Sequence, residues 1–407
     1  MGEIELVVKD LACLLTMDPS LGDGSLGQIS DAAVAFSGGR VAWLGSSAQA
    51  PDAPTVRSLP GTIGLPGLVE CHTHAVWAGS RADELLRRLA GEDYSAILES
   101  GGGILSTVAA TRASSEDVLA ELAAARLVRL RSRGVTTVEI KSGYGLSPAD
   151  EAKLLRAARR AGQLAGVRVL TTFLGAHTVP ASHRSRRAGY VREVIEAQLP
   201  LAAPHADFVD VYVDRGAFTV DEGEAILRAG QALGLGVRIH AEQVTLTGAA
   251  AMAAGLGALS ADHLERIDEA GIAAMARAGT IAVLLPGAML YLRDRPPPVA
   301  ALREAGVPLA VATDLNPGTS PVYDPWTVAT LAAITMGLTI DEVLLGITSI
   351  AGRALGRPEL GRLIPGGPGD LVVMRPPPGE PPSAAALIQQ PTGSDAMLVI
   401  SGGHALP

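Results

Sequence analysis

The feature that most restricts the fold of this 407-residue chain is an alternation of apolar, strand-length runs with helical segments, from Gly67 to about Gly356. Eight such runs can be counted, and they are Leu68–His74, Thr136–Lys141, Arg168–Ala176, Phe208–Asp214, Val237–Ala241, Ala258–His263, Thr280–Leu285 and Leu309–Asp314. Nearly continuous apolar strands that alternate with helices indicate a parallel sheet covered on both faces. Eight units of this length predict a (β/α)8 barrel, with a doubly wound open sheet as the alternative.

Segments rich in Ala, Leu, Arg and Glu lie between most of the runs and predict the covering helices. The clearest are Val118–Arg133, Asp150–Ala161, Val220–Leu233 and Asp268–Ala278. Ser147 followed by Pro148 predicts a helix N-cap with proline in the first turn.

The two ends of the chain have a different sequence pattern, in which short β-like runs are separated by turns. These runs are Glu5–Val8, Ala33–Phe36 and Val41–Leu44 near the start, and Gly369–Met374 and Ala396–Ile400 near the end. Because both ends are rich in strands and the region between them alternates strands with helices, we predict that the two termini build one small β-sandwich together. We therefore expect a composite β-sandwich domain of residues 1–64 and 357–407 and a catalytic barrel of residues 65–356.

Composition limits the partners of the chain. The formal net charge of −9 and the pI of about 5.4 disfavour nucleic acid and anionic membranes. The sequence contains no uninterrupted apolar stretch of about 18 residues, so we expect no transmembrane helix. The first residues lack the basic start and apolar core of a signal peptide. Two cysteines do not make a disulfide framework, which indicates a reducing cytoplasm.

Histidines gather at the carboxyl ends of the runs, where a barrel of this kind has its active site. Residues i and i+2 of a strand share a face, so His72 and His74 present two imidazoles side by side. His240 ends the fifth run and Asp314 the eighth. Three imidazoles and a carboxylate suit Zn²⁺ or Fe²⁺ with a position left for water. Buried core histidines are the alternative, but five of the eight histidines lie at run ends.

Such a metal ion makes water a nucleophile near neutral pH, and a second group must then take the proton. By their places at strand ends, Asp314 and His263 are the candidates. A dinuclear site would commonly need a bridging lysine on the fourth strand, but that run ends in Asp214 and Lys141 lies on the second. We therefore expect a single metal ion.

These residues resemble the metal-dependent amidohydrolase superfamily and, more closely, its imidazolonepropionase family. The resemblance covers nearly the whole chain, and it rests on Pro66–His74, Glu139–Leu146, Phe173–His177, Ser260–Leu264, Ile281–Gly287 and Ala312–Ser320. It implies one zinc or iron ion held by His72, His74, His240 and Asp314. It also implies hydrolytic ring opening of a small molecule, 4-imidazolone-5-propanoate, to N-formimidoyl-L-glutamate, and a homodimer.

The resemblance further implies a set of residues that contact the substrate. They are Arg81, Tyr144, His177, Gln243, Asn316, Gly318 and Thr319. The guanidinium of Arg81 offers a fork of donors that matches the propionate. Tyr144 lies between two glycines, in a loop that can approach a ligand, and Tyr94 is a weaker candidate.

Two departures from related enzymes leave questions open. Related deaminases carry His-x-x-Glu on the fifth strand, whereas this chain has Gln243 in place of the glutamate. Glutamine cannot be a general base, so that role passes to His263 or Asp314, with Glu242 as a third candidate. The fourth run, Val211–Asp214, also differs and its role is open. The alternatives are another mononuclear amidohydrolase or deaminase that acts on a cyclic amide or amidine, and an inactive scaffold.

Overall fold

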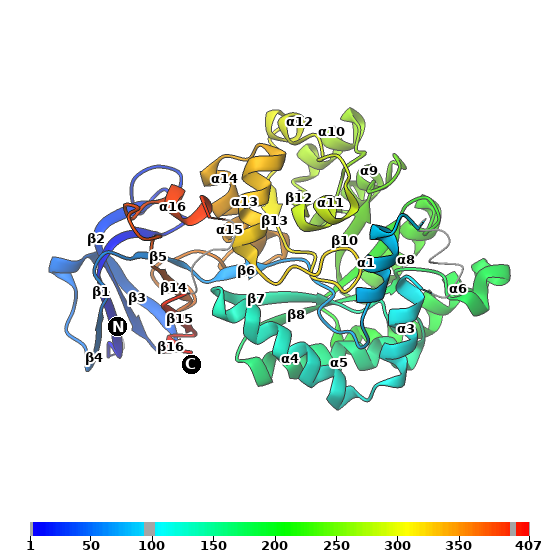
Figure 1. Ribbon diagram of the computed structural model, residues 1–407, viewed down its shortest axis with the longest axis horizontal. Helices are drawn as coiled ribbons and strands as arrows, with labels where there is room; N and C mark the ends of the chain where they lie inside the picture. Colours follow the sequence, from blue (N-terminus) through cyan, green and yellow to red (C-terminus); the bar gives the residue numbers. More distant parts are fainter. Residues whose placement is uncertain (1–2, 93–101, 391–395, 407) are drawn as a thin grey trace.

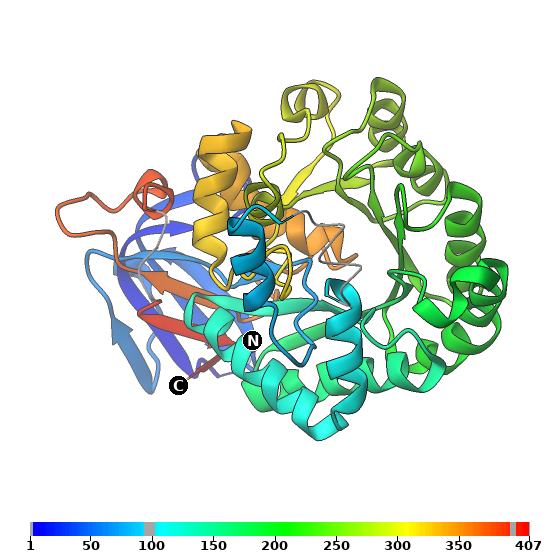
Figure 2. The same ribbon diagram turned by 45° about the vertical axis from the view of Figure 1, so that its right-hand side comes forward.

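The computed structural model describes residues 3–92, 102–390 and 396–406, and it shows a large barrel beside a smaller β-rich unit (Figure 1). Tyr94, the weaker substrate-contact candidate, lies outside the described residues. Both ends of the described chain lie in the β-rich unit, as Figures 1 and 2 show.

Eight parallel strands form the barrel sheet, and each strand pairs with the next one along the chain. They are β6 (Leu68–Glu70), β7 (Val135–Lys141), β8 (Arg168–Ala176), β9 (Phe208–Val213), β10 (Gly236–Ala241), β11 (Ser260–His263), β12 (Ile281–Leu284) and β13 (Leu309–Val311). The eight predicted runs correspond to these eight strands. The first and last are shorter than predicted, because their ladders stop before the chain turns into the site.

The barrel closes between β6 and β13, beyond the ends of both ladders. The backbone N–H of Asp314 donates to the carbonyl of His72 at 3.1 Å, and that of His74 donates to the carbonyl of Leu315 at 2.9 Å. Thr73 and Leu315 form an isolated parallel bridge. The predicted (β/α)8 barrel is thus confirmed, and its closing hydrogen bonds involve His72, His74 and Asp314, three of the residues predicted to bind the metal ion.

Helices cover the outside of the barrel sheet (Figure 2). The longer ones are α1 (Ala82–Leu89), α3 (Ile104–Ala113), α4 (Glu116–Ser132), α5 (Pro148–Ala165), α8 (Val220–Ala232), α10 (Glu269–Ala278) and α13 (Pro325–Met336). The shorter ones are η2 (Ala181–Arg186), α6 (Arg187–Glu193), η3 (Val194–Gln198), α7 (Leu199–Ala202), η4 (Ala203–His205), α9 (Ala249–Gly255), α11 (Pro286–Leu292), α12 (Val299–Glu304), α14 (Ile340–Gly346) and α15 (Ser349–Ala354).

The predicted cap of the helix α5 is present. Ser147 is its N-cap, the side chain of Ser147 accepts a hydrogen bond from the N–H of Asp150, and Pro148 is the first helical residue. Local sequence therefore fixes where this helix begins, directly after the loop that carries Tyr144.

The β-rich unit takes strands from both ends of the chain, as predicted. They are β1 (Leu6–Leu15), β2 (Gln28–Ser37), β3 (Arg40–Ser46), β4 (Thr55–Ser58), β5 (Ile63–Pro66), β14 (Leu371–Met374), β15 (Leu398–Ser401) and β16 (His404–Ala405), with the short helices η1 (Ser47–Gln49) and α16 (Ala384–Ile388). One edge of β1 pairs first with β4 and then with β5, so the sheet divides there. A buried apolar cluster that includes Val8, Phe36 and Val373 joins its two parts, which fits the predicted β-sandwich.

The two units meet tightly at Gly67, the single residue between β5 and β6. A Cβ at this position would lie 2.1 Å from Oγ1 of Thr136, so only glycine lets the strands approach so closely. Asp370, just before β14, accepts a hydrogen bond from the N–H of Gly67 at 3.0 Å and one from the Arg168 guanidinium at 2.8 Å. Where one domain ends and the other begins stays a prediction.

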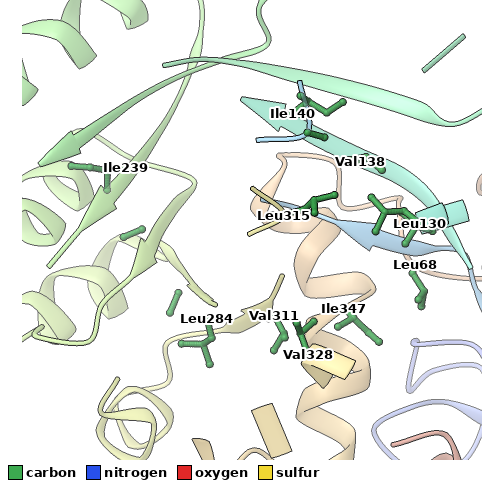
Figure 3. Close-up of a cluster of buried hydrophobic side chains, with 14 of the residues drawn as sticks. Leu68, Leu130, Val138, Ile140, Ile239, Leu284, Val311, Leu315, Val328 and Ile347 are labelled. Atoms are coloured by element: carbon green, nitrogen blue, oxygen red, sulfur yellow. The ribbon is translucent and has the colours of Figure 1, made fainter. Parts of the chain in front are cut away.

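The largest buried apolar cluster fills the space around the barrel strands, where side chains such as Val138, Ile140, Leu284, Val311 and Val328 lie (Figure 3). Cys13 and Cys71 are both buried and form no disulfide. Among the described residues, no helix has the length and apolarity that crossing a membrane requires.

Candidate active site

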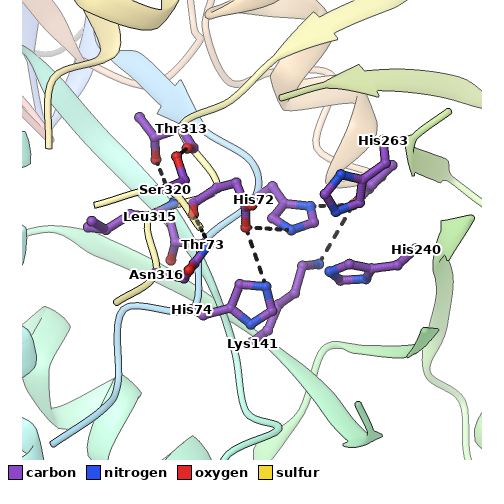
Figure 4. A network of polar contacts seen from close by, with 12 residues as sticks. His72, Thr73, His74, Lys141, His240, His263, Thr313, Leu315, Asn316 and Ser320 are labelled. Carbon is purple, nitrogen blue, oxygen red and sulfur yellow. Dashed lines mark hydrogen bonds and ion pairs between the residues drawn. The ribbon is translucent and has the colours of Figure 1, made fainter. Parts of the chain in front are cut away.

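The four predicted metal ligands meet at the carboxyl ends of the barrel strands, and Figure 4 shows the three histidines among them. His72, His74 and His240 are buried, and one potential ligand atom from each lies within 4.8 Å of the others. Oδ1 of Asp314 lies 3.4 Å from Nε2 of His72 and 3.5 Å from Nε2 of His74. Residues that are far apart in the sequence, such as His72 and His240 at a separation of 168 positions, are thus brought to one point by the barrel.

Buried carboxylates orient two of these imidazoles. Nδ1 of His72 lies 2.6 Å from Oδ2 of Asp262, and Nδ1 of His240 lies 3.0 Å from Oδ2 of Asp210. Since a carboxylate accepts the Nδ1 proton, the lone pair of each ring is left on Nε2. Within the described residues, Nε2 of His72 and Nε2 of His240 are buried without a hydrogen-bond partner. Two such bare nitrogens beside a carboxylate fit a metal ion.

A buried ion network lies beneath this cluster. Nζ of Lys141 lies 3.0 Å from Oε1 of Glu139 and 2.9 Å from Oδ2 of Asp210, and Arg238 donates to Oδ2 of Asp262 at 3.2 Å. Burial alone would raise the pKa of the Asp210 carboxyl, but His240 and Lys141 lower this pKa far below its usual range. Both carboxylates that orient the imidazoles are therefore held in the charged form.

Asp210, Arg238 and Glu139 were not predicted as site residues from the sequence. Asp210, Arg238 and Glu139 each lie within an apolar run, where a charged side chain points into the barrel and needs a partner. That pattern is the signal that could have found them. Lys141 had been considered only as a bridging ligand, and here it is paired with carboxylates instead.

A cavity of about 930 Å³ opens above the cluster. Its lining includes six of the seven predicted substrate contacts, namely Arg81, Tyr144, His177, Gln243, Asn316 and Thr319. Gly318, the seventh, is packed against Arg81 instead: a Cβ there would lie 2.2 Å from Nη1 of Arg81. A side chain at this position would therefore displace the Arg81 guanidinium.

The predicted anion-binding groups already have protein partners. Nε and Nη2 of Arg81 both donate to Oε2 of Glu84, at 2.8 and 2.6 Å. The side-chain oxygen of Asn316 accepts from the backbone N–H of Gly318 at 2.9 Å and of Thr319 at 2.7 Å. Asn316 therefore shapes its own loop, and the two N–H groups are directed at its side chain.

Aromatic rings form one wall of the cavity. The imidazole of His177 stacks on His74, with ring centroids 5.0 Å apart and planes inclined by 16°, and Tyr144 lies 5.9 Å from His74. Nδ1 of His177 lies 3.1 Å from the carbonyl of Gly143 and donates to it, while burial lowers the pKa of His177 to about 3. His177 is therefore neutral, with the lone pair of Nε2 available in the cavity.

His263 and Asp314 both line the cavity, as their predicted role requires. Nδ1 of His263 lies 3.9 Å from Oε1 of Glu265, a buried acid that the sequence analysis did not single out. Burial opposes the charged imidazole, yet the pKa of His263 is raised, because Glu265 and other nearby carboxylates favour that form. Burial raises the pKa of Asp314 to about 6, although His263 and His240 oppose the shift.

Glu242, the third candidate base, is directed elsewhere. Its Oε1 accepts a hydrogen bond from the N–H of Ala250 at 3.3 Å, at the start of α9. It is not among the described residues that line the cavity. Burial raises the pKa of Glu242. The geometry therefore favours a role in fixing the loop after β10.

The fourth strand supports the same loop. Asp214 accepts hydrogen bonds from the N–H groups of Val244 at 2.7 Å and Thr245 at 3.0 Å, and the hydroxyl of Tyr212 donates to Oε1 of Gln243 at 3.0 Å. The open question about Val211–Asp214 thus has a structural answer: this strand end holds Gln243 at the edge of the cavity.

Comparison with known proteins adds to this geometry. The family described as "Amidohydrolase family" matches residues 63–403. Among curated proteins, the imidazolonepropionase of Cupriavidus pinatubonensis is 49% identical over 85% of this chain and 84% of its own length. That of Ectopseudomonas mendocina is 53% identical over 76% and 78%, and that of Paracoccus denitrificans 48% over 89% and 92%.

Solved structures show the same fold at low sequence identity. An adenosine deaminase from Xanthomonas campestris with bound zinc has a TM-score of 0.77 and 19% identity, over 99% of this chain and 93% of its own. A triazine hydrolase from Arthrobacter aurescens has a TM-score of 0.74 and 19% identity, over 99% and 95%. At this identity the likeness concerns the fold alone.

Asp210→Asn should weaken metal binding for two reasons. An amide is a weaker acceptor for the Nδ1–H of His240, and it removes one of the negative charges that pair with Lys141. We expect a loss of affinity on the order of 10–100-fold, measured by competition with a chromogenic chelator. Asp221→Asn, at an exposed carboxylate on α8, is the matched control. Equal affinities in the two variants would show that Asp210 does not support the site.

Proposed function

This chain belongs to the imidazolonepropionase family of the amidohydrolases, and from that premise we propose how its own residues carry out the reaction. The reaction is the hydrolytic ring opening of 4-imidazolone-5-propanoate to N-formimidoyl-L-glutamate, a step of histidine degradation. The observation that carries the proposal is the convergence of the bare Nε2 atoms of His72 and His240 with His74 and Asp314 at the base of one cavity.

We propose that His72, His74, His240 and Asp314 hold one zinc or iron ion, since this ligand set accepts both metals. A bound ion would supply Lewis-acid activation of a water molecule at neutral pH. The charged network beneath keeps Asp210 and Asp262 ionised, so that both can accept hydrogen bonds from the imidazoles.

The substrate would be oriented by the walls of the cavity. The Arg81 guanidinium presents a fork to the propionate, in exchange for or in addition to its contact with Glu84. Tyr144 and His177 would bound the flat ring on one side, with Nε2 of His177 accepting from a ring N–H. On this proposal Gln243 and the loop of Asn316, Gly318 and Thr319 complete the contacts on the other sides.

Asp314 and His263 would share the proton transfers. Attack of water on the ring carbonyl carbon releases a proton, and the ring nitrogen must gain one as the C–N bond breaks. Asp314 would hold the ion through one carboxylate oxygen, which leaves its other oxygen to accept the first proton. His263, supported by Glu265 behind it, would polarise the carbonyl and pass a proton on to the leaving nitrogen.

The other candidate functions have less support. A deaminase would be expected to carry a glutamate where this chain has Gln243, and an inactive scaffold would be expected to lack a ligand, whereas all four are present. We also propose a homodimer that works in the cytoplasm, the first from the family resemblance and the second from two free, buried cysteines. The acidic net charge argues against nucleic acid as a partner.

Removal of the metal ion should abolish turnover, followed as the loss of imidazolonepropionate absorbance with and without chelator. His240→Ala should lose both the metal ion and the activity, because it removes one of three imidazole ligands. Elemental analysis of the purified protein should give one metal ion per chain. Two tightly bound ions at full occupancy, or full activity after chelation, would contradict the proposal.

Arg81→Lys should lower kcat/KM on the order of 10–100-fold, because lysine keeps the charge but loses the two-pronged geometry. The matched control is Arg228→Lys, since Arg228 makes a similar two-nitrogen contact with Glu224 on the exposed surface of α8. Unchanged steady-state kinetics in Arg81→Ala would remove Arg81 from the site.

His263→Asn should lower kcat about 10²–10⁴-fold, the usual contribution of general acid–base catalysis, while the metal ion stays bound. His404→Asn, at an exposed histidine of β16, should leave kcat unchanged. If His263→Asn keeps near-normal kcat, or if Gln243→Ala is far more damaging, the proton transfers belong to another group.

A further inference from the structure

The cavity is also lined by arginines that the proposed reaction does not use. Arg184 belongs to η2, Arg187 begins α6 and Arg215 follows β9. Arg184 and Arg215 are exposed, whereas the ligands His74 and Asp314 at the base are buried. The arginines therefore lie at the opening of the cavity.

Arg187 holds the two arginine-bearing segments together. Its Nε donates to Glu222 at 2.7 Å, its Nη2 donates to the carbonyl of Ala217, and its guanidinium lies 5.3 Å from the ring centroid of Phe218. The segment that carries Arg184 is thus fixed to the loop that carries Arg215. The charge of Arg187 is balanced by Glu222.

Arg184 and Arg215 differ from Arg187 in their partners. Across the described ranges of the chain, neither side chain makes a hydrogen bond or an ion pair with the protein. Two unpaired guanidinium groups at the opening of a cavity are free to meet an anion.

The charge balance of the cavity is opposite to that of the chain. Among the described lining residues, Asp314 is the only acid, against four arginines, although the whole chain has a formal net charge of −9. A cleft lined by one sign of charge raises the local concentration of ligands of the opposite sign. The opening therefore favours anions on a molecule that otherwise repels them.

We propose that Arg184 and Arg215 form an outer anion site, which captures the carboxylate of the incoming substrate before it reaches Arg81. The inference rests on the proposed binding of imidazolonepropionate in this cavity. The ligand class is a small carboxylate, because exposed guanidinium groups bind carboxylates through paired N–H donors. The site acts by long-range attraction and is therefore sensitive to salt.

The test compares Arg184→Gln/Arg215→Gln with a control of equal charge change, Arg277→Gln/Arg353→Gln. Arg277 and Arg353 are exposed, lie outside the cavity lining and make no side-chain ion pair with the described residues. kcat/KM for imidazolonepropionate is measured at about 0.01 M and about 1 M ionic strength, where the Debye length is about 30 Å and about 3 Å.

We expect the cavity variant to lose kcat/KM on the order of tenfold at low ionic strength, and this loss to vanish at high ionic strength. The control should follow the wild-type enzyme at both. Three results would each contradict the outer site. They are a wild-type kcat/KM in the cavity variant, an equal loss of kcat/KM in the control, and a loss of kcat/KM that salt does not alter.

A second measurement separates this inference from the proposed function. Calorimetric titration of chelator-treated protein with imidazolonepropionate requires no turnover. If the wild-type enzyme turns over no substrate, the proposed function fails. The outer site is then tested by the calorimetric affinities alone. Weaker binding in the cavity variant than in the control at low ionic strength supports the site, and equal affinity in both overturns it.

Discussion

Lys141 is buried between two carboxylates, and the rest of the site depends on this ion network. Its ammonium contacts Glu139 and Asp210, while Arg238 contacts Asp262. A buried charge without a partner costs several kcal/mol, so the network constrains all of its members together. Asp210 and Asp262 also accept hydrogen bonds from Nδ1–H of His240 and His72. The orientation of these two predicted metal ligands is therefore set by charges that lie one layer below them.

Three residues at or near the site have a strained backbone conformation. Glu242, His263 and Asp314 all have positive φ angles, of 54°, 81° and 52°, and each lies at or just after the carboxyl end of a barrel strand. A residue with a side chain occupies this region at a cost that the surrounding structure must offset. Here the barrel offsets it, and the turns direct His263 and Asp314 into the cavity but Glu242 towards α9.

The sequence allowed the eight strands and the convergence of His72, His74, His240 and Asp314 to be predicted, because the strand runs are continuous and parallel strands end on one rim. It did not allow the contact between Asp210 and His240 to be predicted, since that contact depends on the register of β9 against β10. The pairing of Arg81 with Glu84 and the self-contained loop of Asn316 were missed for a similar reason: side chains of suitable chemistry were assigned to a ligand before their protein partners were known.

Anomalous diffraction from crystals of the metal-loaded protein tests the central claim most directly. We expect one anomalous peak per chain, about 2.0–2.2 Å from Nε2 of His72 and His240, with Asp314 alongside. In the same map, Nδ1 of both imidazoles should remain against Asp262 and Asp210. A second peak beside Lys141, or coordination through Nδ1, would contradict the claim that the buried carboxylates set the ligand geometry.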